Sequence, residues 1–152
     1  MDSRNPITIV TIGIVTLFLL GAWVISHSNE NFTIRLAELS ASKARWEKLK
    51  PIEYNYTVKS GCMFVQSYNI EHRNRQIFKF PVGQSTPRES LSIKEVFDIA
   101  EKATRLSYSV DIIYHPYFGY PELIDVDWDK DIIDDECFVQ ITDFDVLTKN
   151  EI

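Results

Sequence analysis

The strongest constraint on this chain is an uncharged apolar stretch near its N-terminus, Ile7 to Ile25, which reads ITIVTIGIVTLFLLGAWVI. As a helix, a stretch of this length spans roughly 28 Å, close to the hydrocarbon thickness of a bilayer. We therefore expect a transmembrane anchor at residues 7–25, with residues 1–6 as a cytoplasmic tail. A cleaved signal peptide is the alternative, although the stretch is longer than most signal-peptide cores.

The charges beside this stretch indicate an orientation. Arg4 precedes it, whereas Glu30 and Glu38 lie beyond it. Because positive residues favour the cytoplasmic side of a membrane, we expect everything after His27 to lie outside the cytoplasm. The sequence thus predicts a membrane protein that crosses once and carries an extracytoplasmic C-terminal domain.

The net charge comes from one segment. The chain has 152 residues and a formal charge of -6, and Asp125 to Glu136 alone holds seven acids and one lysine. The other charges cancel, and no cluster of Lys and Arg is present. Because nucleic-acid binding needs a basic surface, this composition argues against a nucleic-acid partner.

The sequence after the apolar stretch divides into a helix and a domain. Residues 31–50 lack Gly and Pro and repeat apolar side chains at helical spacing from Phe32 to Leu49, which predicts an amphipathic helix or stalk ended by Pro51. Residues 51–152 have the length of one domain. Ser92 and Glu95 form a capping-box pattern, which predicts a helix from Ile93 to about Arg105.

The segments around this helix have strand composition and are joined by short polar turns. This order favours an α+β fold, an antiparallel sheet with one packed helix, preceded by the N-terminal transmembrane helix. The expected strands lie in Glu53–Val58, Met63–Ile70, Gln76–Val82, Ser107–Tyr114, Glu122–Trp128 and Cys137–Val146.

The acidic segment LIDVDWDKDIIDDE has the spacing of a calcium-binding loop. Its carboxylates would fill EF-hand positions 1, 3, 5, 7 and 12, but Lys130 occupies position 6, where the loop needs glycine, and a strand pattern leads in. A calcium site and a solvated acidic strand and turn are both open, and no other cofactor is expected. The candidate ligands are Asp125, Asp127, Asp129, Asp131 and Glu136.

The two cysteines, Cys62 and Cys137, are candidates for a disulfide if the domain is exported. Such a bridge would stabilise the fold by about 4.5 kcal/mol in the chain-entropy model. Two buried thiols, or a bridge to a partner, are the alternatives.

Several motifs together resemble an uncharacterised family of small exported bacterial proteins, many of them lipoproteins. They are Trp46 before a Tyr-x-Tyr strand, a nearby cysteine, the helix start SIKEVFDIA and the run IIYHPYFGYPELIDVD. His115 stands where the family usually has aspartate. The resemblance implies a bacterial cell-envelope location and a domain type, but no reaction. The residues on the family signature are Tyr114, Tyr117, Gly119, Tyr120, Pro121, Ile124 and Asp127.

No catalytic pattern is present. The three histidines, His27, His72 and His115, show neither metal-ligand spacing nor a nucleophile partner. We therefore expect a non-enzymatic module that binds an unknown protein partner.

Overall fold

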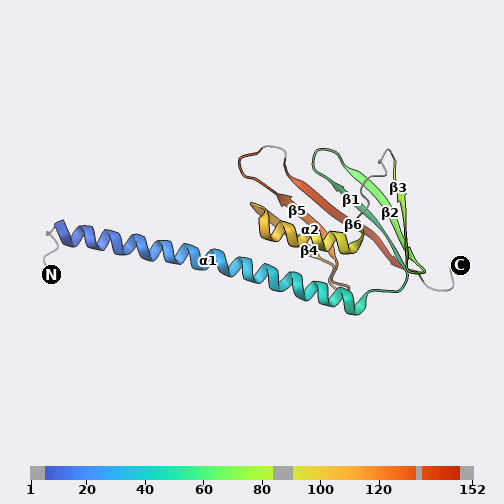
Figure 1. Ribbon diagram of the computed structural model, residues 1–152, viewed down its shortest axis with the longest axis horizontal. Helices are drawn as coiled ribbons and strands as arrows, with labels where there is room; N and C mark the ends of the chain where they lie inside the picture. The colour runs from blue at the N-terminus through green and yellow to red at the C-terminus, as the bar shows by residue number, and fades with distance from the viewer. Residues whose placement is uncertain (1–5, 84–90, 133–134, 148–152) are drawn as a thin grey trace. The chain divides into compact units, whose positions relative to one another are not determined.

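The computed structural model describes residues 6–83, 91–132 and 135–147, without the side chains of residues 6–8 and 24–31. The chain divides into two compact units, Met1–Arg35 and Leu36–Ile152. Helix α1 runs through both units, and every other element belongs to the second (Figure 1). The elements are α1 (Pro6–Leu49), β1 (Tyr54–Gly61), β2 (Gln66–Arg73), β3 (Gln76–Pro81), α2 (Ile93–Leu106), β4 (Ser109–Tyr114), β5 (Pro121–Asp127) and β6 (Cys137–Val146).

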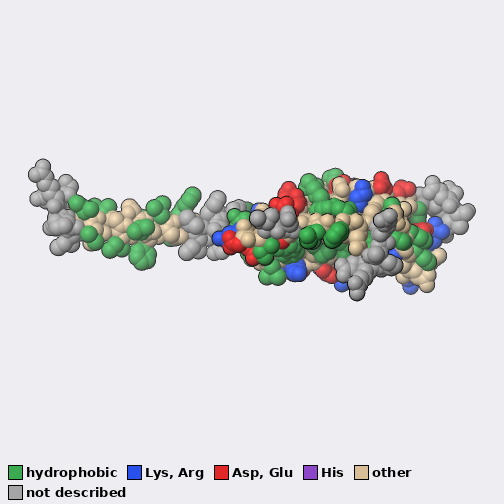
Figure 2. All heavy atoms as spheres, turned by 90° about the horizontal axis from the view of Figure 1, so that it is seen from above, with side chains coloured by type: hydrophobic (Ala, Val, Ile, Leu, Met, Phe, Trp, Pro, Cys, Tyr) green, Lys and Arg blue, Asp and Glu red, His purple; other side chains and the backbone are tan. Residues whose placement is uncertain are grey.

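The N-terminal unit shows that the predicted transmembrane helix is wrong. Its described apolar side chains run from Ile9 to Trp23, which is 15 residues, and Figure 2 shows no charged side chain among them. Within the described residues, no helix has both the length and the apolar character that a membrane crossing requires. Residues 1–5 of the predicted tail lie outside the described residues.

The six strands form one antiparallel sheet in the order β3-β2-β1-β6-β5-β4. Strands β1 and β2 form one hairpin, β2 and β3 form the next, and β4 and β5 form a third. The last strand, β6, pairs with β1 on one side and β5 on the other, and it therefore joins the two halves of the sheet.

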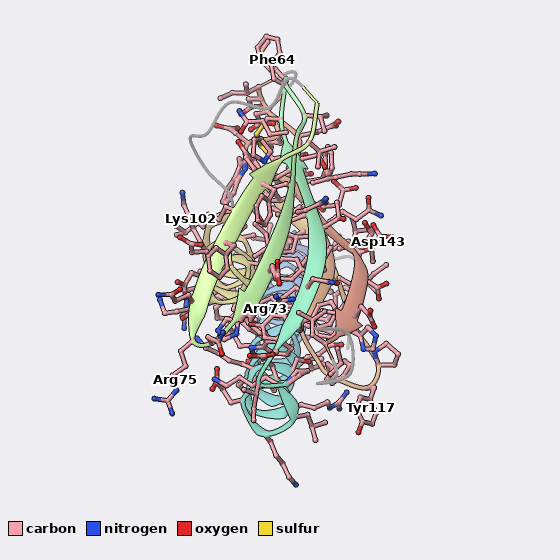
Figure 3. All side chains as sticks on the ribbon, turned by 90° about the vertical axis from the view of Figure 1, so that its right-hand side faces the viewer. Phe64, Arg73, Arg75, Lys102, Tyr117 and Asp143 are labelled. Atoms are coloured by element: carbon pink, nitrogen blue, oxygen red, sulfur yellow. A yellow bond between two sulfur atoms is a disulfide. The ribbon has the colours of Figure 1, made fainter. Side chains whose placement is uncertain are left out.

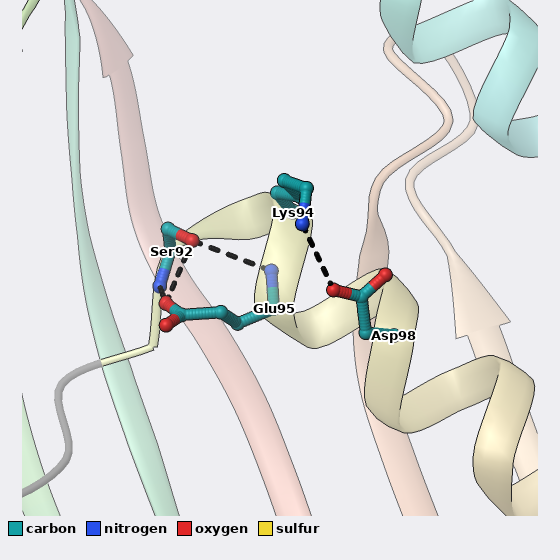
Figure 4. A network of polar contacts seen from close by, with 4 residues as sticks. All are labelled: Ser92, Lys94, Glu95 and Asp98. Atoms are coloured by element: carbon teal, nitrogen blue, oxygen red, sulfur yellow. Dashed lines mark hydrogen bonds and ion pairs between the residues drawn. The ribbon is translucent and has the colours of Figure 1, made fainter.

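Helix α2 begins where the capping box was predicted (Figure 4). The Glu95 N–H donates to Ser92 Oγ at 3.3 Å, and the Ser92 N–H donates to the Glu95 carboxylate at 2.7 Å. These bonds satisfy backbone donors that the first turn would otherwise leave unpaired. They also lower the pKa of Glu95, because the backbone N–H of Ser92 stabilises its charged form most.

The core lies between one face of the sheet and two helical segments. The sheet buries alternate residues such as Tyr54, Tyr56 and Val58 of β1, and α2 buries Val96 and Phe97 against them. The predicted single packed helix is therefore also wrong, since the C-terminal part of α1 contributes buried side chains as well. These are Leu39, Ser42 and Trp46.

The predicted helix at residues 31–50 is this C-terminal part of α1 rather than a separate element. No Gly or Pro interrupts the chain between Trp23 and Leu49, so nothing in the sequence ends the helix earlier.

Candidate functional site

The predicted calcium segment forms the end of β5 and the connection to β6. Asp125 and Asp127 belong to β5, and β6 begins at Cys137. Between them, the Asp131 N–H donates to Asp129 Oδ1 at 3.0 Å, which closes a turn. The arrangement is strand, turn and strand, rather than the helix, loop and helix of an EF-hand.

The carboxylates of this segment repel one another. Loss of solvation and then the repulsion from Asp135 raise the pKa of Asp127, and Asp135 Oδ1 is buried without a hydrogen-bond partner in the described part of the chain. Among the described residues, no three or more His, Cys, Asp or Glu side chains are arranged to hold a metal ion. Asp134 lies outside the described residues. Calcium binding by Asp125, Asp127, Asp129, Asp131 and Glu136 therefore stays a prediction.

The structure joins Cys62 and Cys137 in a disulfide across 75 residues of sequence. Cys62 follows β1 and Cys137 begins β6, so the bridge links two neighbouring strands at one end of the sheet. Beside it lies a mainly apolar pocket of about 280 Å³, where Lys102 Nζ sits 5.0 Å from the centre of the Trp128 ring. This geometry indicates that the disulfide and the packed side chains hold this end of the sheet together.

The residues of the predicted signature between β4 and β5 form a corner that packs on α1. The Trp46 ring meets the rings of Phe118, Tyr120 and Phe144 edge to face, with centroids 5.8 to 6.5 Å apart. Arg45 Nη1 donates to the Pro116 carbonyl at 3.1 Å. Tyr120 of the predicted signature and its neighbour Phe118 therefore have a structural role, because their rings fix the corner to the helix.

The histidines are bound into local structure. His115 Nδ1 accepts hydrogen bonds from the Tyr117 and Phe118 N–H groups at 3.2 and 3.1 Å. His72 Nδ1 lies 3.1 Å from the Ile52 carbonyl oxygen. The side chain of His27 lies outside the described residues. The expectation that the chain is not an enzyme stays a prediction.

The second face of the sheet was not predicted from the sequence. Both helical segments of the second unit pack on one face, so the other, here called the open face, carries no covering element within the described ranges. At its edge, β4 exposes the side chains of Ser109, Asp111 and Ile113. The signal was available in the sequence, because these residues alternate with the more buried Val110 and Ile112.

Strand β4 also has an outer edge that no described strand pairs with. The Tyr108 N–H donates to the Trp128 carbonyl at 3.3 Å, so it points toward the β5 side. Backbone groups alternate in direction along a strand, and those of Ser109, Asp111 and Ile113 therefore point away from β5. Asp111 lies directly opposite Asp125 of β5, which adds negative charge to the open face beside this edge.

Comparisons with known proteins identify a family and no individual relative. Neither a curated protein nor a solved structure shows significant similarity to the chain. Residues 38–146 match the model of a family described as a family of unknown function (DUF6174). The match covers more than half of the chain and contains all six strands and α2. The chain therefore belongs to the family of unknown function DUF6174.

Proposed function

We propose that this chain is a non-catalytic interaction domain that works outside the cytoplasm, in the bacterial cell envelope, and binds an extended basic segment of a partner protein. The observation that carries the proposal is the outer edge of β4, which pairs with no strand in the described part of the chain and lies beside the acidic part of the open face.

The location is supported by the cysteines and by the signature. A disulfide between Cys62 and Cys137 persists in oxidising compartments and is rare in the cytosol. The residues from Tyr114 to Asp127 resemble those of exported proteins. Trapping free thiols with an alkylating reagent in intact cells tests the location. The native chain should resist alkylation at both cysteines, and full alkylation would contradict an oxidising location.

The mode of binding follows from the strand edge. An extended peptide can pair with a free edge through main-chain hydrogen bonds and so add a strand to the sheet. The outward backbone groups of Ser109, Asp111 and Ile113 supply the donors and acceptors. Such an edge provides affinity without requiring a deep cavity.

The charge of the partner follows from the neighbouring carboxylates. A residue of the added strand that lies opposite Asp111 would place its side chain on the open face, about 5 Å from it. Asp125 lies one strand further on, and the segment Asp125 to Glu136 carries the net charge of the whole chain. Lys or Arg at alternate positions of the partner would complement this surface and accelerate encounter.

The experiment uses a synthetic eight-residue peptide that alternates lysine with threonine, titrated into the oxidised full chain at low salt. We expect saturable binding that weakens with salt. A peptide with glutamate in place of lysine, and one N-methylated on its pairing edge, should both bind at least about tenfold more weakly. Equal binding of the N-methylated peptide would reduce the interaction to charge attraction and contradict strand addition.

Two variants of the chain separate backbone pairing from charge. Ile113→Pro removes an outward N–H that β5 does not use, and proline is tolerated at such edge positions, so the fold should persist while binding is lost. Asp111→Asn keeps the backbone and should weaken binding with a smaller salt dependence. Binding that is unchanged in both variants would place the peptide elsewhere on the molecule.

A further inference from the structure

A second part of the open face is hollowed, away from β4 and from the acidic segment. The hollow has a volume of about 390 Å³ and lies over β1, β2, β3 and β6. Figure 3 labels Asp143 of β6, which lines the hollow, and Arg73 of β2, which forms an ion pair with the lining residue Glu71. The side chains that face the hollow and matter here are those of Asn55, Thr57, Asn69, Glu71, Phe80 and Asp143.

The hollow depends on an irregularity in β6. The register between β1 and β6 shifts between Asn55 and Thr57, and Asp143 has a φ of 55°. Such a bulge places an extra residue on one strand and changes the direction of its side chain. Thr142 pairs with Thr57 on the open face, and the bulge brings the next residue, Asp143, to the same face.

The polar groups of the hollow are held in place by neighbours. Thr57 Oγ1 donates to Asn69 Oδ1 at 3.1 Å, which leaves the Asn69 amide N–H groups for a ligand. Arg73 Nη2 lies 2.8 Å from Glu71 Oε1 and fixes that carboxylate. A ligand would therefore meet donors and acceptors that are already oriented, which reduces the entropy cost of binding.

Thr142 fixes the second carboxylate in the same way, because its Oγ1 donates to Asp143 Oδ2 at 2.9 Å.

One wall of the hollow is apolar. Phe80 pairs with Asn69 across β2 and β3, so its ring lies on the open face, where it is 52% exposed. The ligand must therefore combine an apolar patch with several hydroxyl or amide groups.

The charges around the hollow further restrict the class of ligand that can bind there. The carboxylates of Glu71 and Asp143 disfavour an anion, and the Arg73 guanidinium beside Glu71 disfavours a cation at that carboxylate. A neutral sugar satisfies both conditions. Its C–H face can lie on an aromatic ring, and each of its hydroxyls can donate to a carboxylate and accept from an amide N–H.

We propose that this hollow binds a neutral saccharide of one or two rings, with Phe80 against the sugar face and Asn55, Asn69, Glu71 and Asp143 around its hydroxyls. The site is separate from the β4 edge, and it does not depend on the partner proposed above.

The test is ligand-observed NMR with the oxidised full chain and a panel of neutral disaccharides at millimolar concentration, namely maltose, cellobiose, lactose and N,N′-diacetylchitobiose. We expect at least one of them to bind, and Phe80→Ala and Asn69→Ala each to weaken that binding by about tenfold or more. Phe78→Ala is the matched control, because Phe78 is exposed on the same strand and the same face but does not line the hollow.

Three results would overturn the proposal. They are no binding by any disaccharide, binding that survives both Phe80→Ala and Asn69→Ala, and tighter binding of glucosamine or glucuronic acid than of the neutral sugars. Thermal unfolding of each variant confirms that it remains folded. The peptide titration reports on β4 separately, so either proposal can fail while the other holds.

Discussion

Gly119 lies directly against the backbone of Ser42 in helix α1. A Cβ atom on Gly119 would lie 2.7 Å from the Ser42 carbonyl oxygen and 3.0 Å from Arg45 Cβ, and the φ of Gly119 is +83°. Glycine is therefore required twice, for the backbone conformation and for the close approach. This contact fixes the corner between β4 and β5 to the C-terminal part of α1.

We predict that Gly119→Ala lowers the free energy of unfolding by about 2 to 4 kcal/mol, since it combines left-handed strain with steric overlap. Urea unfolding measures the change. Gly83→Ala is the control, because Gly83 also has a positive φ of 69° but nothing within 4 Å of its Cβ position. It should cost only about 1 to 2 kcal/mol. Equal losses in the two variants would mean that the approach to Ser42 is not tight.

His115 is expected to act as a hydrogen-bond acceptor in its turn rather than as a catalytic group. His115→Asn keeps an acceptor for the Tyr117 and Phe118 N–H groups, whereas His115→Phe keeps only the ring that stacks on Tyr120. The Asn variant should be the more stable of the two by about 1 kcal/mol. Thermal unfolding compares them, and a more stable Phe variant would show that ring stacking dominates.

Reduction of the disulfide is expected to destabilise the domain. Cys62→Ser with Cys137→Ser should lose about 4 kcal/mol of unfolding free energy, because the unfolded chain regains the freedom of the long loop. The urea midpoint of the native chain should fall to that of the double variant when a reductant is added, and the double variant should not respond. An unchanged native midpoint would contradict a stabilising bridge.

Asp127 is expected to destabilise the fold at neutral pH. Its pKa is raised above 3.8 in the folded state, so the folded chain holds this proton more tightly than the unfolded chain, and stability falls as pH rises through the folded pKa. Asp127→Asn removes this effect.

The thermal midpoint of the Asp127→Asn variant should therefore exceed that of the native chain at pH 7, and the difference should shrink toward pH 3. Asp125→Asn, on the same strand, controls for the loss of one negative charge and should give a smaller gain. A constant difference across this pH range would contradict the role given to Asp135.

Local features of the fold were predictable from the sequence. The Ser92 and Glu95 capping box depends on residues three apart, and the structure contains it. The end of α1 was harder to predict, because an uncharged apolar stretch shows where a helix is favourable but not where the helix ends. Because no Gly or Pro follows Trp23 before Leu49, α1 continues to Leu49. The count of apolar residues in its first part led to the wrong prediction of a membrane span.

Long-range features could not be predicted in the same way. Alternation in β6 shows which side chains face the core but not that Ile141 lies beside Val58. The positive φ at the bulge belongs to Asp143 and not to a glycine, so the sequence gives no sign of it. In the sequence, residues such as Asn55 and Asn69 look like ordinary solvent-facing positions. Only the pairing of their strands brings them together at one hollow.

The central place of β6 has a consequence for how the protein is made. Among the described strands, the one that joins β1 to β5 comes last in the chain, so the nascent chain can form hairpins but cannot complete this sheet until residues 137–146 have been made. Sheets that depend on such distant pairings fold slowly. The two halves of the sheet therefore stay separate until β6 pairs with both β1 and β5, which makes closure of the sheet a late step in folding.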